Sequence, residues 1–356
     1  HLGFRSEWWY FTGVLRARSA AGGSPRDFGY QVTFFRQALA PAAAQGPSAW
    51  RARDTYMAHF ALSALEPVGG SGREGPRGRE LSTSPFRAAE RFARAGNALA
   101  GAEASPFAVW TDDWRVDEAG AGRWHVRARA EGMAVDLMLS LGQSRGPILQ
   151  GPGGLSRKGP APGQASYYHS WTRIPTEGTV TLAGASTGAS TGAASASGAD
   201  AVSVEGFTWL DREWSTAPLA QGVRGWDWMG LSLTDGRDLM LYVLRDEGGN
   251  PIAQSCATVI GPDRIAHLYG PDAFHAKAQG SWTSPDSGVR YPARFAVDLP
   301  AASLSLTITP RRPDQELRLA VRYWEGAVAV TGTSVGQPVK GEGYLELTGY
   351  DAQRVQ

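Results

Sequence analysis

Cysteine and net charge are what this sequence has least of. Its 356 residues include a single cysteine, Cys256, which excludes an intrachain disulfide and any CxxC metal or redox site. The 35 Lys and Arg residues nearly balance the 34 Asp and Glu residues, and the formal net charge is +1. Because such a chain has no strong field to attract polyanions, we expect no nucleic-acid partner.

Long hydrophobic runs and the common catalytic motifs are also missing. The apolar runs are far shorter than the ~20 residues of a membrane-spanning helix, so we expect no integral membrane segment. The sequence has no Walker loop, no HExxH motif and no histidine pair at metal-ligand spacing. The patterns GxSxG, at residues 142–146, 184–192 and 332–336, and GxGxxG, at residues 70–75, occur only in isolation, without the strand–turn–helix pattern that a nucleophile elbow or a dinucleotide site needs. Serine-hydrolase, nucleotide and zinc-protease chemistry therefore have no support, and we expect neither a metal nor another cofactor.

Aromatic residues are frequent and are mixed with glycine and proline. The chain has 13 Trp, 11 Tyr and 12 Phe among 45 Gly and 22 Pro, which is typical of many short strands joined by tight turns. Segments with period-two alternation recur from residues 8–16 to residues 343–350. We predict an all-β fold of antiparallel barrels, with a short helix at residues 86–95.

The length favours two domains, at roughly 100–200 residues per domain. A Gly/Ala/Ser/Thr tract at residues 184–200 has almost no side chain to bury. The tract is either an interdomain linker or a long hairpin tip near the boundary. We predict an N-terminal domain at residues 1–195 and a C-terminal domain at residues 196–356.

The motif VEGFTWLDREWS, residues 204–215, is chemically the richest. On an extended chain Trp209, Asp211 and Glu213 project to one side, and Arg212 and Trp214 project to the other. Two carboxylates so close together raise each other's proton affinity, so that one of them can act as a general acid near neutral pH. The alternative is a structural pair that neutralises barrel arginines.

The opening motif and a central motif add candidate ligand contacts. In HLGFRSEWWYFTGVL, Glu7 and Trp9 share one strand face. Glu7 either faces a ligand or pairs with an arginine beside tryptophans that plug a barrel. In SYYHSWTR, Tyr167 and His169 share a face, and the histidine is either a ligand contact or a packed, hydrogen-bonded residue.

Three motifs in the second half pair aromatic and acidic residues. In GWDWMGLSL, Trp226 and Trp228 face one way and Asp227 the other. Two tryptophans beside a carboxylate suit a flat apolar ligand or a carbocation, although aromatic core packing is the commoner use. Tyr323 and Glu325 alternate in YWEGAV, as do Tyr344 and Glu346 in GYLELTGY, and each of these carboxylates, if buried, is either a functional group or half of an ion pair.

In this order, the motifs resemble the family of AttH-like proteins and carotenoid 1,2-hydratases. The collinear match runs from residue 1 to about residue 350 and includes SEWWYFTG, LQGPGGLSRKGP, WLDREWS and GYLELTGY. The resemblance implies two consecutive lipocalin-like (calycin) antiparallel β-barrel domains that enclose a site for an apolar small molecule. It also implies a secreted or periplasmic location, with or without a lipid anchor, and leaves room for association with a membrane transporter.

The resemblance leaves the reaction less certain than the fold. Family members commonly have Asp-His-x-Trp where this chain has Arg212 between Asp211 and Glu213, and a guanidinium cannot give its proton to an alkene. We expect binding of a terpenoid, polyketide or lipid-like molecule and a cofactor-free, acid-assisted hydration or cyclisation. A non-catalytic carrier or transporter accessory protein is the alternative.

The expected roles follow from these motifs. Asp211 or Glu213 is the expected proton donor. The expected substrate contacts are Glu7, Trp9, Tyr167, His169, Trp209, Arg212, Trp214, Trp226, Asp227, Trp228, Tyr323 and Glu325.

Overall fold

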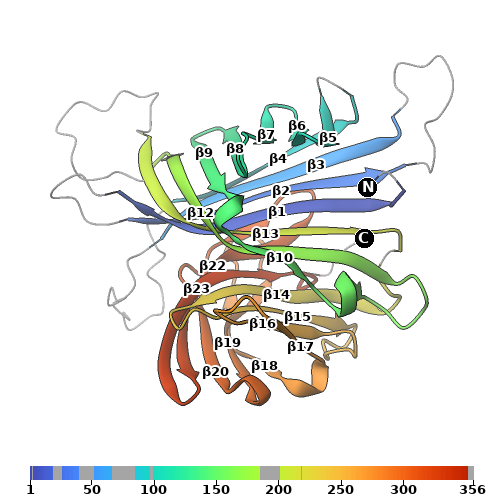
Figure 1. The fold of residues 1–356 in the computed structure, drawn as a ribbon, viewed down its shortest axis with the longest axis vertical. Helices are drawn as coiled ribbons and strands as arrows, with labels where there is room; N and C mark the ends of the chain where they lie inside the picture. The colour runs from blue at the N-terminus through green and yellow to red at the C-terminus, as the bar shows by residue number, and fades with distance from the viewer. Residues whose placement is uncertain are drawn as a thin grey trace.

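The computed structural model describes residues 1, 3–18, 26–39, 52–65, 85–96, 99–184, 201–217 and 219–351. Within these ranges the chain forms β-strands and four short 3₁₀ turns. The strands make two antiparallel sheets, one above the other in Figure 1. The predicted all-β, lipocalin-like architecture is therefore confirmed.

The first sheet curls into a nearly closed barrel. Its strand order is β4-β3-β2-β1-β13-β12-β9-β8-β7-β6-β5, with β10 and β11 also paired to β12. The two end strands are consecutive in the chain and are joined by a bridge between Gly96 and Ala100. Its strands are β1 (Ser6–Ala17), β2 (Asp27–Ala38), β3 (Asp54–Leu65), β4 (Phe86–Arg94), β5 (Ala100–Ala104), β6 (Phe107–Thr111), β7 (Trp114–Glu118), β8 (Arg123–Ala130), β9 (Met133–Ser140), β10 (Arg145–Leu149), β11 (Leu155–Arg157), β12 (Ala165–Leu182) and β13 (Val202–Ser215).

The helix predicted at residues 86–95 is wrong, because this segment is strand β4. It pairs with β3 along its whole length, from Ser63 opposite Phe86 to Thr55 opposite Arg94. Its alanines favour a helix in isolation, but propensity is a weak force beside the hydrogen bonds offered by an unpaired strand edge. Pairing in the folded barrel therefore decides the conformation.

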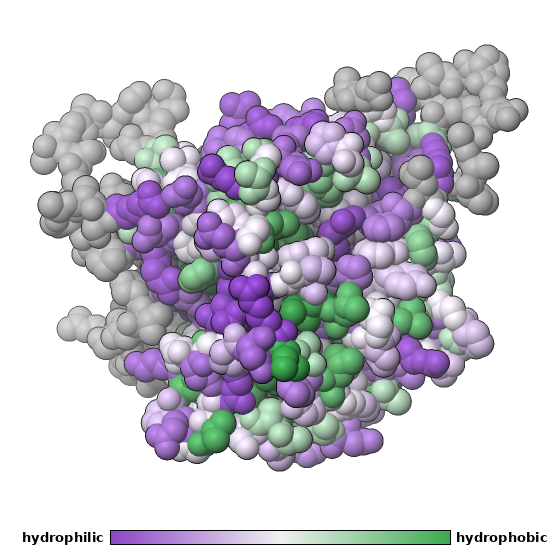
Figure 2. All heavy atoms as spheres, in the orientation of Figure 1, coloured by the Kyte–Doolittle hydropathy of each residue, from purple (hydrophilic) through white to green (hydrophobic). Residues whose placement is uncertain are grey.

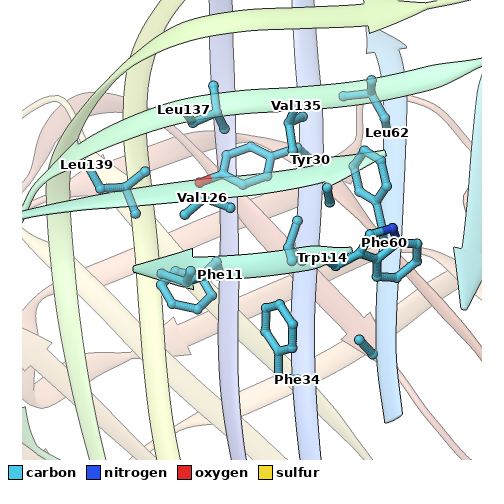
Figure 3. Close-up of a cluster of buried hydrophobic side chains, with 14 of the residues drawn as sticks. Phe11, Tyr30, Phe34, Phe60, Leu62, Trp114, Val126, Val135, Leu137 and Leu139 are labelled. Carbon is cyan, nitrogen blue, oxygen red and sulfur yellow. The ribbon is translucent and has the colours of Figure 1, made fainter. Parts of the chain in front are cut away.

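The interior of the first barrel is filled with apolar side chains. Phe11, Phe34, Phe60 and Trp114 are buried there and point toward one another across the barrel in Figure 3. Because side chains alternate along β1, Trp9 and Phe11 enter this core while Trp8 and Tyr10 face the second sheet. The barrel interior is thus a packed core.

The second sheet has its own apolar core, which includes Leu241, Phe295 and Trp324. Its strand order is β17-β16-β15-β14-β23-β22-β20-β19-β18, with β21 also paired to β22. Its strands are β14 (Val223–Leu233), β15 (Asp238–Asp246), β16 (Cys256–Ile260), β17 (Ala266–Tyr269), β18 (His275–Thr283), β19 (Arg290–Leu299), β20 (Leu304–Pro310), β21 (Glu316–Arg318), β22 (Arg322–Ser334) and β23 (Gln337–Leu347).

Strand β13 belongs to the first sheet, although it follows the Gly/Ala/Ser/Thr tract. Residues 185–200 of that tract lie outside the described part of the chain. The strands on either side pair with each other, with Val180 opposite Val202, so the tract connects two strands of one sheet. The chain passes to the second sheet after Ser215, and the predicted domain division at residue 195 stays a prediction.

Aromatic side chains form the contact between the sheets. Tyr10 and Tyr168 of the first sheet pack with Trp228, Tyr242 and Tyr344 of the second. The face of the molecule in Figure 2 is largely hydrophilic, with hydrophobic residues gathered in patches around its middle. In the described part of the chain, no helix is long and apolar enough to span a membrane.

Candidate functional site

A cavity of about 840 Å³ lies between the two sheets. Strands β1, β2, β12 and β13 form one wall, strands β14, β15, β22 and β23 form the other, and the connection after β13 lines one side. This cavity, rather than the packed core of either sheet, is the candidate ligand site. Its aromatic lining consists of Trp8, Tyr10, Phe35, Tyr168, Trp226, Trp228, Tyr242 and Tyr323.

Strand β13 contributes two carboxyl groups to this cavity. Asp211 and Glu213 line it, whereas Leu210, on the opposite face of β13, enters the core of the first barrel. The alternation predicted for WLDREWS is therefore observed, since residues two apart on a strand share one face.

Asp211 is buried and held by three hydrogen bonds. Tyr168 Oη donates to Oδ2 at 2.5 Å, while Ser170 Oγ and Trp209 Nε1 donate to Oδ1 at 2.5 and 2.7 Å. Burial raises the pKa of Asp211 to about 7, although the three hydrogen bonds lower it, and the charge of Glu213 adds the smallest contribution. Desolvation, rather than the repulsion between carboxylates expected from the sequence, is therefore the main cause of the raised pKa of Asp211.

Glu213 is held as one half of an ion pair. Its Oε1 lies 3.1 Å from Lys158 Nζ and also accepts a hydrogen bond from Ser166 Oγ. The ammonium of Lys158 lies over the rings of Tyr242 and Tyr168, 4.2 and 5.2 Å from their centroids. These contacts satisfy Glu213 and make Asp211 the better proton donor of the two.

Tyr168 was missed by the sequence analysis. Its hydroxyl accepts a hydrogen bond from Trp228 Nε1 at 2.9 Å and donates one to Asp211. The neighbours that were proposed instead, Tyr167 and His169, lie on the other face of β12. The alternation in SYYHSW separates the two faces, but it does not tell which one meets the second sheet.

A second pair of carboxyls comes from β22 and β23. Glu325 lies directly opposite Glu346, which also lies opposite Trp228 on its other side. Glu325 is 2% exposed, and its carboxyl lies near the hydroxyls of Tyr10 and Tyr323 without making a hydrogen bond of normal geometry to any described residue. Burial and then the charge of Glu346 hold the pKa of Glu325 well above its usual value, and the hydroxyls of Tyr10 and Tyr323 offset only part of this.

Glu346 alternates with Tyr344 in GYLELTGY and was expected to be either a functional group or half of an ion pair, but it was not among the expected substrate contacts. Burial raises its pKa to about 7, while a hydrogen bond with Trp226 lowers it and the charges of Asp211 and Glu213 raise it further. The cavity thus holds two carboxyls, Asp211 and Glu346, that titrate near neutral pH.

Several predicted residues lie away from the cavity, in an ion-pair and aromatic cluster. Glu7 accepts a hydrogen bond from Arg212 Nη2 at 3.1 Å and lies 3.6 Å from Arg36 Nε. Trp214 stacks with Tyr167, their centroids 5.7 Å apart, and meets His169 edge-on at 5.0 Å. Trp9, Tyr167, His169, Arg212, Trp214 and Glu7 are all absent from the cavity lining.

Asp227 is also separate from the cavity. It lies 3.2 Å from Arg245 Nε and accepts a hydrogen bond from Tyr350 Oη at 2.9 Å. Its neighbours Trp226 and Trp228 line the cavity, as do Tyr323 and Glu325. In the described ranges, no three His, Cys, Asp or Glu side chains are grouped so that they could hold a metal ion.

The stability of the protein should fall as pH rises toward neutrality. The pKa of Glu346 is 4.5 in the unfolded chain and about 7 in the fold, so the folded state binds more protons between these values. Between about pH 4.5 and pH 7, the wild type should lose on the order of 2 kcal/mol more unfolding free energy than Glu346→Gln.

Urea denaturation across this pH range measures the difference. Glu342→Gln is the matched control, because Glu342 lies on the same strand and pairs with Arg16 outside the cavity. It should keep the pH dependence of the wild type. If the stability of Glu346→Gln and that of the wild type depend equally on pH, the pKa of Glu346 is not raised on folding.

Comparison with known proteins places the chain in a family. Residues 1–350 match the model of the AttH-like family. The crystal structure of an AttH protein from Nitrosomonas europaea is 32% identical over 99% of this chain and 94% of that one, with a TM-score of 0.76. Kievitone hydratase from Nectria haematococca has the same fold at 13% identity, covering 96% of this chain and 88% of its own, with a TM-score of 0.65. No curated protein matches the sequence. The chain belongs to the AttH-like family.

Proposed function

We propose that the cavity binds a hydrophobic small molecule and that Asp211 donates a proton to a carbon–carbon double bond of that molecule. The observation that carries this proposal is a buried carboxyl, with a pKa of about 7, in an aromatic-lined cavity. A general acid works best when its pKa lies near the working pH. At neutral pH a large fraction of the Asp211 carboxyls are therefore protonated and can donate that proton.

Two reactions follow from such a transfer. The Asp211 proton forms a bond to one alkene carbon, and the electron pair of the double bond leaves the other carbon as a cation. In hydration, water adds to that cation and returns a proton to the Asp211 carboxylate. In cyclisation, a second double bond attacks the cation, and loss of a proton to the carboxylate restores the acid. The rings of Tyr10, Trp226 and Trp228 would stabilise the positive charge.

The comparisons support this class of reaction without naming a substrate. Kievitone hydratase is, by its name, a hydratase, and it shares this fold. A large cavity between two sheets suits the body of a terpenoid, polyketide or lipid-like molecule. A carrier would need the same cavity but would leave the molecule unchanged.

The first test is whether the purified protein holds such a molecule. We expect mass spectrometry of solvent extracts to find an apolar compound with the wild type. Ala217→Trp places a large ring in the connection that lines the cavity. It should reduce the amount of compound recovered by roughly threefold to fivefold, which corresponds to a loss of roughly 0.7–1 kcal/mol of binding free energy. Ala301→Trp, at an exposed residue outside the cavity lining, is the matched control and should not change recovery. Equal recovery from both variants would place the molecule elsewhere and contradict the proposal.

A further inference from the structure

The charges that line the cavity are strongly unbalanced. Five lining residues are acidic and two are basic. Of these, Arg5 and Glu247 are exposed to solvent and carry opposite charges. The remaining lining residues with ionisable carboxyl or amino groups are Asp211, Glu213, Glu325, Glu346 and Lys158.

Among these carboxyl groups, Glu213 has a cationic partner within the protein. Lys158 lies 3.1 Å from Glu213, so its charge is already engaged. Asp211 receives its three hydrogen bonds from neutral groups. Glu325 is buried and forms no ion pair with any described residue; the hydroxyls of Tyr10 and Tyr323 lie near its carboxyl, but neither of its oxygens makes a hydrogen bond of normal geometry. A buried polar group without a partner is costly, so the cavity offers unused hydrogen-bonding and charge capacity at this point.

Aromatic rings lie beside the carboxyls of Glu325 and Glu346. Trp228 is opposite Glu346 on the adjacent strand, and Tyr10 meets Trp228 edge-on with centroids 5.2 Å apart. Trp226 also lines the cavity and faces Glu346 closely enough to lower its pKa through a hydrogen bond. Carboxylates next to indole and phenol rings are the surroundings in which proteins hold organic cations.

We propose that the molecule bound in this cavity is an organic cation, a hydrophobic body with a positively charged nitrogen that lies between Glu325 and Glu346 and against the rings of Tyr10 and Trp228. The proposal rests on the proposed function, because the same cavity must take up a hydrophobic molecule. It adds a substrate class. Without a ligand, Glu325 and Glu346 avoid the burial of two negative charges by keeping protons. When the cation binds, its positive charge replaces those protons.

Two flat probes of similar shape test the charge alone. N-methylacridinium carries a fixed positive charge, and phenazine is neutral. In titrations that follow tryptophan fluorescence at pH 8, the cation should bind roughly tenfold more tightly than phenazine, the size expected for a desolvated cation–π contact together with a charge pair. Glu325→Gln and Glu346→Gln should each remove most of this preference while leaving the phenazine affinity within about twofold.

The matched control is Glu342→Gln, on the same strand as Glu346 but outside the cavity, which should change neither affinity. Unchanged phenazine binding shows that each variant keeps a folded cavity. If both probes bind the wild type equally well, the cation assignment is overturned and the proposed function stands. If neither probe binds, both proposals fail.

Discussion

An Asp211→Asn variant should lose at least about 100-fold in turnover of the molecule recovered from the cavity, the usual contribution of a general acid. The amide cannot donate the proton that starts hydration or cyclisation. It keeps the size of the carboxyl, so the variant should still bind the molecule. Turnover is measured in water labelled with heavy oxygen, where hydration adds the label to the product and cyclisation leaves the product unlabelled and isomeric with its precursor.

Two comparisons make this result specific to Asp211. Glu213→Gln should lose less activity, because Glu213 is engaged by Lys158 and serves to fix that ammonium over Tyr242. Glu342→Gln, outside the cavity, should keep full turnover. If Asp211→Asn lowers the melting temperature but leaves turnover unchanged, Asp211 has a structural role only. If the wild type forms no product, the protein is a carrier rather than an enzyme.

Arg212 lies outside the cavity, although it is next to Asp211 in the sequence. The motif has Arg212 where relatives commonly have histidine, which weakened the expectation of a hydratase. In the fold, Arg212 pairs with Glu7 and does not line the cavity. The proton donor proposed for the cavity, Asp211, is hydrogen-bonded to Tyr168, Ser170 and Trp209 and does not depend on that position.

Alternation along single strands could be read from the sequence, and it was informative within each motif. It separated Asp211 and Glu213 from Arg212, and Trp226 and Trp228 from Asp227. It could not say which face of a strand meets the other sheet, because both faces of β12 and β13 are rich in aromatic and polar residues. That choice is made by packing between residues far apart in the chain.

The same limit explains the missed residues. Tyr168 and Glu346 come from different sheets and lie 178 positions apart in the sequence, so only the docking of the sheets brings them to one cavity. The place of β13 in the first sheet was hidden for a related reason. Pairing with β1 from Val204 to Ser215 places β13 in the first sheet, and alternation within the segment does not indicate which strand it pairs with.

The docking of the two sheets depends on a carboxylate at the start of β15. Asp238 is fully buried and accepts hydrogen bonds from Thr172 Oγ1 and Arg173 Nε of the first sheet, both at 2.7 Å, and from Arg145 Nη1 at 3.3 Å. Arg173 lies at an irregularity of β12 and has a positive φ of 49°. That backbone conformation is strained for arginine, so the contacts it permits must offset the strain.

An Asp238→Ala variant should therefore lose about 3–5 kcal/mol of unfolding free energy, as when one partner of a buried ion pair is removed. The two arginines, with side chains 18% and 21% exposed, would keep their charges without the central acceptor. Glu177→Ala is the matched control, since Glu177 is 56% exposed in its pair with Arg18 and should cost at most about 1 kcal/mol.

Because Asp238 connects the walls of the cavity, its loss should also weaken ligand binding without touching a lining residue. Urea denaturation gives the stability, and phenazine titration below the denaturation midpoint gives the affinity. Arg173→Gly adds a second route to the same contact, because glycine adopts a positive φ without strain. This variant removes the ion pair together with the hydrogen bonds that Arg173 Nη2 donates to the carbonyls of Leu233 and Arg237. An exposed ion pair contributes at most about 1 kcal/mol to stability. If Asp238→Ala and Arg173→Gly both leave the unfolding free energy within about 1 kcal/mol of the wild type, aromatic packing rather than this ion pair holds the sheets together.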